Sequence, residues 1–84
     1  MKNNKIMEII IPNQGLTLTE VEITIWHKKI GEVVEKGDVL FEFESDKATI
    51  EFDSPVNGVL VEIVSEEGVV VPIGGVVARI SFNQ

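Results

Sequence analysis

The chain has 84 residues and a mass of 9.3 kDa, which is enough for one domain with a thin core but too little for an enzyme with an interdomain cleft. Hydrophobic residues make up 44% of it and charged residues 25%, the balance of a folded domain. With no cysteine and one histidine, His27, the chain excludes a disulfide framework, a cysteine nucleophile, a zinc finger and a His-rich metal site, so no metal is expected. The net charge of −7 argues against nucleic-acid binding, because an acidic surface repels phosphate.

The sequence contains no segment typical of a membrane protein. Its longest apolar stretches, such as residues 9–11 and 69–71, are far shorter than the roughly 18 residues that span a bilayer. Residues 1–5 are not followed by the apolar run of a signal peptide. We therefore expect an intracellular domain without a membrane partner, in the cytoplasm of a bacterium or the mitochondrial matrix of a eukaryote.

The residue types and their period-two alternation predict β-strands throughout. Val occurs 13 times and Ile 11 times, whereas Ala occurs twice, and β-branched residues favour strands. Alternation of apolar and polar residues predicts eight strands, at residues 5–11, 20–26, 32–34, 39–44, 48–53, 59–64, 69–71 and 76–81. Strict alternation places on the buried faces the side chains of Val21, Ile23, Ile25, Val39, Phe41, Phe43, Ala48, Ile50, Phe52, Val59, Val61, Ile63, Val76, Ala78 and Ile80. It places Trp26 on a polar face, as a partly buried packing residue.

An internal repeat relates the two halves of the chain. A shift of 37 residues aligns Gly31 with Gly68 and Gly37 with Gly74, together with the apolar residues around them. These glycines are interpreted as backbone requirements of turns, and Asn57 and Gly58 as turn residues. Earlier in the chain the offset is 43, so the first half has six extra residues, expected as a surface loop within residues 16–21. The repeat predicts an all-β fold, a flattened barrel or sandwich of two four-stranded antiparallel sheets with pseudo-twofold symmetry.

Lys47 stands out within an acidic segment. Residues 37–78 contain nine acidic residues and one basic residue, which is Lys47. Such a segment would attract a basic partner surface, although acidity also keeps a small domain soluble. Lys47 falls in the turn between two predicted strands, and the repeat places this turn at the opposite end of the domain from the chain termini. An exposed lysine is usually only solubilising, but a rigid hairpin also suits a residue that another protein must reach and modify.

The residues around this turn resemble those of a known family. Residues 44–50, Glu-Ser-Asp-Lys-Ala-Thr-Ile, and residues 54–58, Ser-Pro-Val-Asn-Gly, closely resemble the lipoyl domain of 2-oxo acid dehydrogenase complexes. The resemblance extends from about residue 6 to residue 80. We therefore interpret residues 1–84 as a single lipoyl-type domain with its core at about residues 6–81. The loop at residues 15–20 and residues 48–50 look most like domains of pyruvate or acetoin complexes, although that subgroup usually has glycine where this chain has Val21.

The resemblance implies a carrier rather than an enzyme. Lys47 would carry lipoic acid in amide linkage, and the domain would have no catalytic residues of its own. Its partners would be a lipoate ligase or lipoyl transferase, a thiamine-diphosphate 2-oxo acid dehydrogenase, the acyltransferase core and dihydrolipoamide dehydrogenase. A monomeric domain of the acyltransferase component is expected, and tethering would raise the effective concentration of the carried group at each active site.

Other residues have more ordinary interpretations beside the functional one. Asp46 and Ala48 would be recognised with Lys47 by the lipoylating enzyme, although Asp46 is also a turn former. Glu44 and Glu51 would contact the ligase or the decarboxylase, or would simply be solvated. The loop within residues 16–21 would contribute to recognition by the decarboxylase, or would be an ordinary connection. His27 has no carboxylate or serine beside it in the sequence and is interpreted as a surface residue.

Three alternatives are compared with the lipoyl carrier. A biotinyl carrier domain typically holds its lysine between two methionines, whereas Lys47 lies between Asp46 and Ala48 and the only methionines are Met1 and Met7. A non-catalytic β interaction domain would share the repeat but gives no reason for an Asp-Lys-Ala turn at its centre. A complete acyltransferase would need a further catalytic domain with its own histidine.

Overall fold

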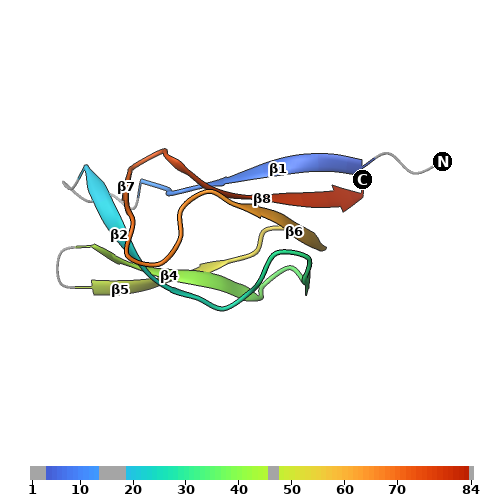
Figure 1. Cartoon of the computed structure of the whole chain (residues 1–84), viewed down its shortest axis with the longest axis horizontal. Helices are drawn as coiled ribbons and strands as arrows, with labels where there is room; N and C mark the ends of the chain where they lie inside the picture. Colours follow the sequence, from blue (N-terminus) through green and yellow to red (C-terminus); the bar gives the residue numbers. More distant parts are fainter. Residues whose placement is uncertain (1–3, 14–18, 46–47, 84) are drawn as a thin grey trace.

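The computed structural model describes residues 4–13, 19–45 and 48–83, which form eight β-strands and no helix (Figure 1). The strands are β1 (Asn4–Ile10), β2 (Glu20–Trp26), β3 (Val33–Val34), β4 (Val39–Ser45), β5 (Ala48–Asp53), β6 (Gly58–Ile63), β7 (Val70–Pro72) and β8 (Val76–Asn83). All eight predicted strands are confirmed, with their ends moved by at most two residues. The described residues therefore include no helix that could cross a membrane.

The strands form two four-stranded antiparallel sheets, which confirms the predicted fold class. One sheet has the order β1-β8-β6-β3 and the other the order β5-β4-β2-β7. A shift of 37 residues carries β2, β3 and β4 onto β6, β7 and β8, and a shift of 43 carries β1 onto β5. These shifts convert the first sheet order into the second, so each sheet combines strands from both halves and the pseudo-twofold relation holds in three dimensions.

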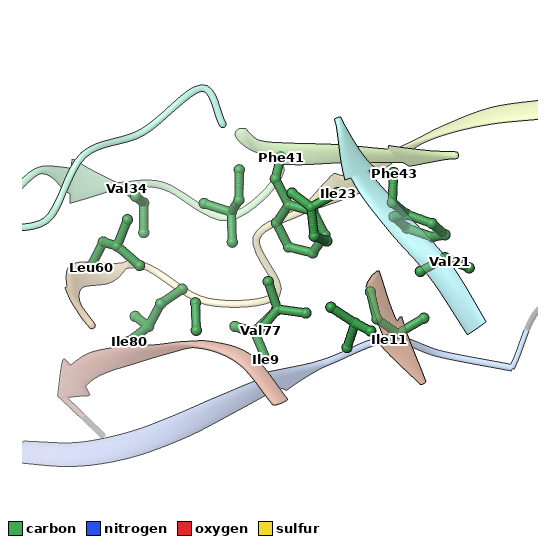
Figure 2. Packing of buried hydrophobic residues seen from close by; sticks show 13 residues of the cluster. Ile9, Ile11, Val21, Ile23, Val34, Phe41, Phe43, Leu60, Val77 and Ile80 are labelled. Carbon is green, nitrogen blue, oxygen red and sulfur yellow. The ribbon is translucent and has the colours of Figure 1, made fainter. Parts of the chain in front are cut away.

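The core lies between the two sheets. Thirteen buried hydrophobic residues form one cluster, in which Phe41, Ile23, Leu60, Val77 and Ile80 are completely buried. Figure 2 shows Phe41 and Ile23 directed from one sheet toward Val77 and Ile9 of the other. Burial of such side chains is the main stabilising term in a domain of this size.

Four β-bulges change which residues face the core. The pairing register skips Thr24 in β2, Leu40 in β4, Val61 in β6 and Val77 in β8. The positions obey the repeat, because Thr24 and Val61, and likewise Leu40 and Val77, are 37 residues apart. A bulge places two residues opposite one on the partner strand, so two consecutive side chains share a face.

The bulges correct the prediction based on strict alternation. Leu40 and Val77 were expected to face away from the core but are completely buried beside Phe41 and Ala78. Leu60, expected on the opposite face from Val61, is also completely buried. Conversely, Ile25 is 44% exposed and Val61 is 42% exposed, although alternation places both inward. Each of these errors lies at a bulge or within one residue of it.

The bulge at Thr24 also changes the face of β2 on which the Trp26 side chain lies. Its expected position on the polar face is wrong, because the bulge turns it toward the core, where its ring centroid lies 4.9 Å from that of Phe41. Its expected role as a partly buried packing residue is confirmed. The indole nitrogen donates a hydrogen bond to the carbonyl oxygen of Ser65 at 2.9 Å, which satisfies its one polar group.

The predicted turn glycines divide into two kinds. Gly31, Gly37, Gly68 and Gly74 have φ between 86° and 96°, which confirms that these turns require glycine. Gly58 is instead the first residue of β6 and has no positive φ, so its interpretation as a turn residue is wrong. A Cβ atom at Gly58 would lie 2.3 Å from the carbonyl oxygen of Ser81, so close strand packing requires glycine there.

The bulges predict losses of stability of different size for two substitutions. Leu40→Ala should lower the free energy of unfolding by about 2–5 kcal/mol because it opens a cavity in the core. Val61→Ala should cost less than about 1 kcal/mol because the side chain is largely in solvent. Urea denaturation of both variants measures the difference. A larger loss for Val61→Ala would show that strict alternation, rather than the bulged register, describes the strands.

Candidate functional site

The hairpin between β4 and β5 contains the predicted site. Asp46 and Lys47 lie outside the residues that the structure describes, whereas Ala48 is described and exposed. The last described pair before the turn is Ser45 opposite Ala48. This pair and the start of β2 lie at one end of the molecule, whereas the paired residues Asn4 and Asn83 lie at the other (Figure 1). The ends of the hairpin strands are thus far from the chain ends, as the repeat predicts.

Aromatic contacts hold the hairpin strands on the core. The rings of Phe41 and Phe52 stack across β4 and β5, with centroids 5.0 Å apart and planes inclined by 7°. Phe41 also contacts Trp26 of β2 and lies 6.1 Å from Phe43, both distances being between ring centroids. Since Phe41 and Phe43 are almost completely buried, β4 is a rigid support for the exposed residues that follow it.

The outer face of these strands is acidic. Glu22 of β2 lies directly opposite Glu44 of β4, and Glu42 of β4 lies opposite Glu51 of β5. Like charges at directly opposed positions destabilise a sheet, so this arrangement is not one that stability alone favours. In the described part of the chain, His27 is the one basic side chain within salt-bridge distance of these four carboxylates, and it contacts Glu42.

His27 is exposed, which confirms its interpretation as a surface residue, but the structure brings a carboxylate to it that its sequence neighbours do not provide. Its Nε2 atom lies 2.7 Å from Oε2 of Glu42. The bulge at Thr24 places Ile25 opposite Glu42, and His27 then reaches the same carboxylate from the end of β2. Recognising the pair from sequence would have required knowing the bulged register.

The outer face of the other sheet is electrically compensated. Arg79 of β8 donates hydrogen bonds to Glu62 at 2.7 Å and to Glu8 at 3.0 Å. The Glu62 and Glu8 carboxylates raise the pKa of the Arg79 guanidinium, because both accept hydrogen bonds from its charged form. The domain therefore has one acidic outer face, which contains the hairpin strands, and one face on which acidic residues surround an arginine.

The Asp38 carboxylate stabilises the turn that precedes β4, at the other end of this strand from Ser45. The backbone N–H of Glu35 donates to Oδ2 of Asp38 at 2.9 Å, and Nζ of Lys28 lies 3.5 Å from the same oxygen. The pKa of Asp38 is lowered mainly by the hydrogen bond from Glu35 and then by Lys28. This carboxylate closes the turn at Gly37, which explains its position without a functional role.

The surface depressions of the described residues also lie away from the hairpin end. One shallow groove is lined by residues near the chain ends, including Val33, Asn57 and Phe82, and another by Trp26, Ile30 and their neighbours. No cluster of three or more metal-binding side chains occurs among residues 4–13, 19–45 and 48–83. Neither of these grooves is lined by Ser45 or Ala48, so the described end of the hairpin is not part of either one.

Comparison with known families gives a match over most of the chain. The biotin/lipoyl family, described as "Biotin-requiring enzyme", matches residues 7–80. The dihydrolipoyllysine-residue succinyltransferase component of the 2-oxoglutarate dehydrogenase complex from Rickettsia typhi is 39% identical over 75 residues, 89% of this chain and 19% of that protein. The acetyltransferase component of the Staphylococcus aureus pyruvate dehydrogenase complex is 40% identical over 73 residues, 87% of this chain and 17% of that protein.

A third relative and a solved structure agree with these matches. The acetyltransferase component of the Bacillus subtilis acetoin cleaving system is 34% identical over 74 residues, 88% of this chain and 19% of that protein. The chain therefore spans less than a fifth of the length of each of these three relatives. The solution structure of the lipoyl domain of the 2-oxoglutarate dehydrogenase complex from Azotobacter vinelandii superposes with a TM-score of 0.78 at 28% identity, covering 92% of this chain and 98% of that one. The chain thus belongs to the biotin/lipoyl attachment family and has the fold of a lipoyl domain.

Proposed function

We propose that the chain is a covalent carrier whose Lys47 bears lipoate and which moves acyl groups between the enzymes of a 2-oxo acid dehydrogenase complex. The observation that carries this proposal is the β4–β5 hairpin, whose last described pair, Ser45 and Ala48, lies at the opposite end of the molecule from Asn4 and Asn83. A group attached there is presented to partners without obstruction by chain that continues from either terminus.

The attachment requires a simple acyl transfer. The neutral amine of Lys47 attacks the carbonyl carbon of lipoate activated by ATP as a mixed anhydride with phosphate. The N–C bond forms, the C–O bond to the activating phosphate breaks, the phosphate leaves with that oxygen and the nitrogen loses one proton. A lipoate ligase or lipoyl transferase supplies this activation. When attached, the dithiolane supplies the disulfide and thiol chemistry that a chain without cysteine lacks. The residues of this domain support the hairpin and keep it accessible.

The flanking residues would set the specificity of attachment. Ala48 is exposed and pairs with Ser45, so its methyl group adds little bulk where an enzyme must bind. We propose that Ala48 and Asp46 are recognised together with Lys47. A biotinyl carrier is the second candidate because the matching family includes both cofactors. The relatives at 34–40% identity, all described as dihydrolipoyllysine-residue proteins, favour lipoate.

Lys47→Arg tests the attachment site. The variant should retain the stability of the wild type, because the contacts of Phe41 that hold the hairpin strands do not depend on residue 47. It should nevertheless accept no lipoate, because guanidinium stays protonated and is a poor nucleophile. Peptide mapping by mass spectrometry after incubation with lipoate, ATP and ligase measures the modification.

The remaining lysines provide an internal control for that experiment. Lys2, Lys5, Lys28, Lys29 and Lys36 should stay unmodified in both proteins, since none lies in an Asp-Lys-Ala turn. Lipoyl amide on any of them in the wild type, or undiminished modification of Lys47→Arg, would refute the assignment of Lys47.

We further propose that the domain serves a complex of the pyruvate or acetoin type. The supporting observations are the residues at 15–20 and 48–50 and the acetyltransferase relatives, while the 2-oxoglutarate relative is similar to nearly the same degree. Reductive acylation of the lipoylated domain should show a kcat/KM at least tenfold higher with a pyruvate decarboxylating component than with a 2-oxoglutarate one. The reverse preference would contradict the proposed substrate class.

The acidic outer face would dock a basic surface of the decarboxylating component. Glu44 belongs to this face and is exposed, while Glu22 lies directly opposite it. Complementary charge raises association rates in a salt-dependent way. Glu44→Gln should therefore lower kcat/KM for reductive acylation about threefold at low salt, and the difference should disappear at about 1 M salt, where the screening length is short.

Glu8→Gln is the matched control for that substitution. It removes the same charge from the compensated face, where the amide can still accept a hydrogen bond from Arg79. Its kcat/KM should equal that of the wild type. If the two variants lose rate equally, net charge rather than the acidic face determines docking.

A further inference from the structure

A shallow groove opens on the surface where the two halves of the internal repeat meet. Six of its lining residues form three pairs whose members are 37 residues apart. These pairs are Trp26 with Ile63, Lys29 with Glu66, and Ile30 with Glu67. Each half of the chain therefore contributes equivalent positions, and the pseudo-twofold axis passes through the groove.

The two turns beside this groove have equivalent backbone structures. In one turn the N–H of Glu32 donates to the carbonyl oxygen of Lys29 at 3.0 Å. In the other turn the N–H of Val69 donates to the carbonyl oxygen of Glu66 at 3.1 Å. The rotation that relates the two halves thus exchanges these turns, and what distinguishes them is the charge of their side chains.

Each turn carries one charge that the domain itself does not compensate. Lys29 and Glu66 are exposed, and within residues 4–13, 19–45 and 48–83 neither side chain belongs to an ion pair. Lys28 is instead paired with Asp38, and a carboxylate oxygen of Glu67 already accepts a backbone hydrogen bond. The groove therefore has one basic and one acidic side.

The surface between these two charges is apolar. Ile30 is 61% exposed, although it is a large aliphatic residue. Trp26 and Ile63 are only partly buried against the core and line the same groove. A partly exposed tryptophan with aliphatic neighbours and a charged rim is the composition of a protein contact surface.

We propose that two copies of this domain associate through this groove. The repeat makes the groove complementary to itself. When a second copy faces it after a half-turn, the basic side of each copy lies against the acidic side of the other, and both contacts form at once. Lys29 of each copy then pairs with Glu66 of the other, around a centre that contains Trp26 and Ile63.

The dimer formed in this way is weak and reversible. The groove is small compared with the interfaces of stable dimers, and the net charge of −7 on each copy opposes association. The monomer expected from the family resemblance is therefore the form at low concentration. The proposal is independent of the proposed carrier function, because it involves neither Lys47 nor a cofactor.

Sedimentation equilibrium of the wild-type domain measures the association. The weight-average mass should equal the chain mass of 9.3 kDa in dilute solution. It should rise by about half at about 1 mM protein, as a dissociation constant of about 1 mM requires. Trp26, the only tryptophan, should change its fluorescence over the same concentration range.

Reversal of the two charges tests whether the groove is the contact. Lys29→Glu and Glu66→Lys should each weaken association about tenfold, because each places like charges together twice in the dimer. The double variant, which carries both substitutions, should recover the wild-type affinity. All three variants should melt close to the wild-type temperature, since both residues are exposed and outside the strands.

Glu51→Lys is the matched control for Glu66→Lys. Both substitutions make the net charge two units less negative, but Glu51 lies in β5 and does not line the groove. Glu51→Lys should associate at least as well as the wild type. A wild type that stays monomeric at about 1 mM would overturn the proposal. So would stronger association of Glu66→Lys, or a double variant that associates no better than the single ones.

Discussion

The contacts of Phe41 hold together the strands that support the proposed attachment hairpin. Its ring stacks on Phe52 of β5 and contacts Trp26 of β2, so three strands of one sheet are joined at a single buried side chain. The hairpin strands β4 and β5 continue from this point to the exposed end of the molecule. A carrier that must present one side chain to several enzymes needs such an anchor, because a loosely held hairpin would lose part of its binding energy to ordering.

The internal repeat explains why the hairpin and the chain ends lie at opposite ends. The shifts of 37 and 43 residues relate the pair Ser45–Ala48 to the pair Phe82–Lys5 of β8 and β1. In one half the two strands are connected through residues 46 and 47, whereas their equivalents in the other half are the first and last strands. The two sheets thus share one geometry, although their outer faces differ in charge.

The sequence predicted the eight strands and the four positive-φ glycines because period-two alternation and left-handed backbone leave clear signals in residue types. It did not predict the bulges at Thr24, Leu40, Val61 and Val77, because no special residue is needed where an extra residue enters a strand. Beyond a bulge, alternation counted from one end of the strand gives the wrong face, as Ile25 and Trp26 show. The His27–Glu42 contact was missed for the same reason, whereas Lys47 stays a prediction that rests on its acidic surroundings and its family resemblance.

The intact mass of the wild-type domain after enzymatic modification tests most directly whether the hairpin carries lipoate. The domain is incubated in parallel with lipoate and a lipoate ligase and with biotin and a biotin ligase, each with ATP. We expect one lipoyl group per chain in the first reaction and no added mass in the second. One biotinyl group per chain, with no lipoyl addition, would contradict it.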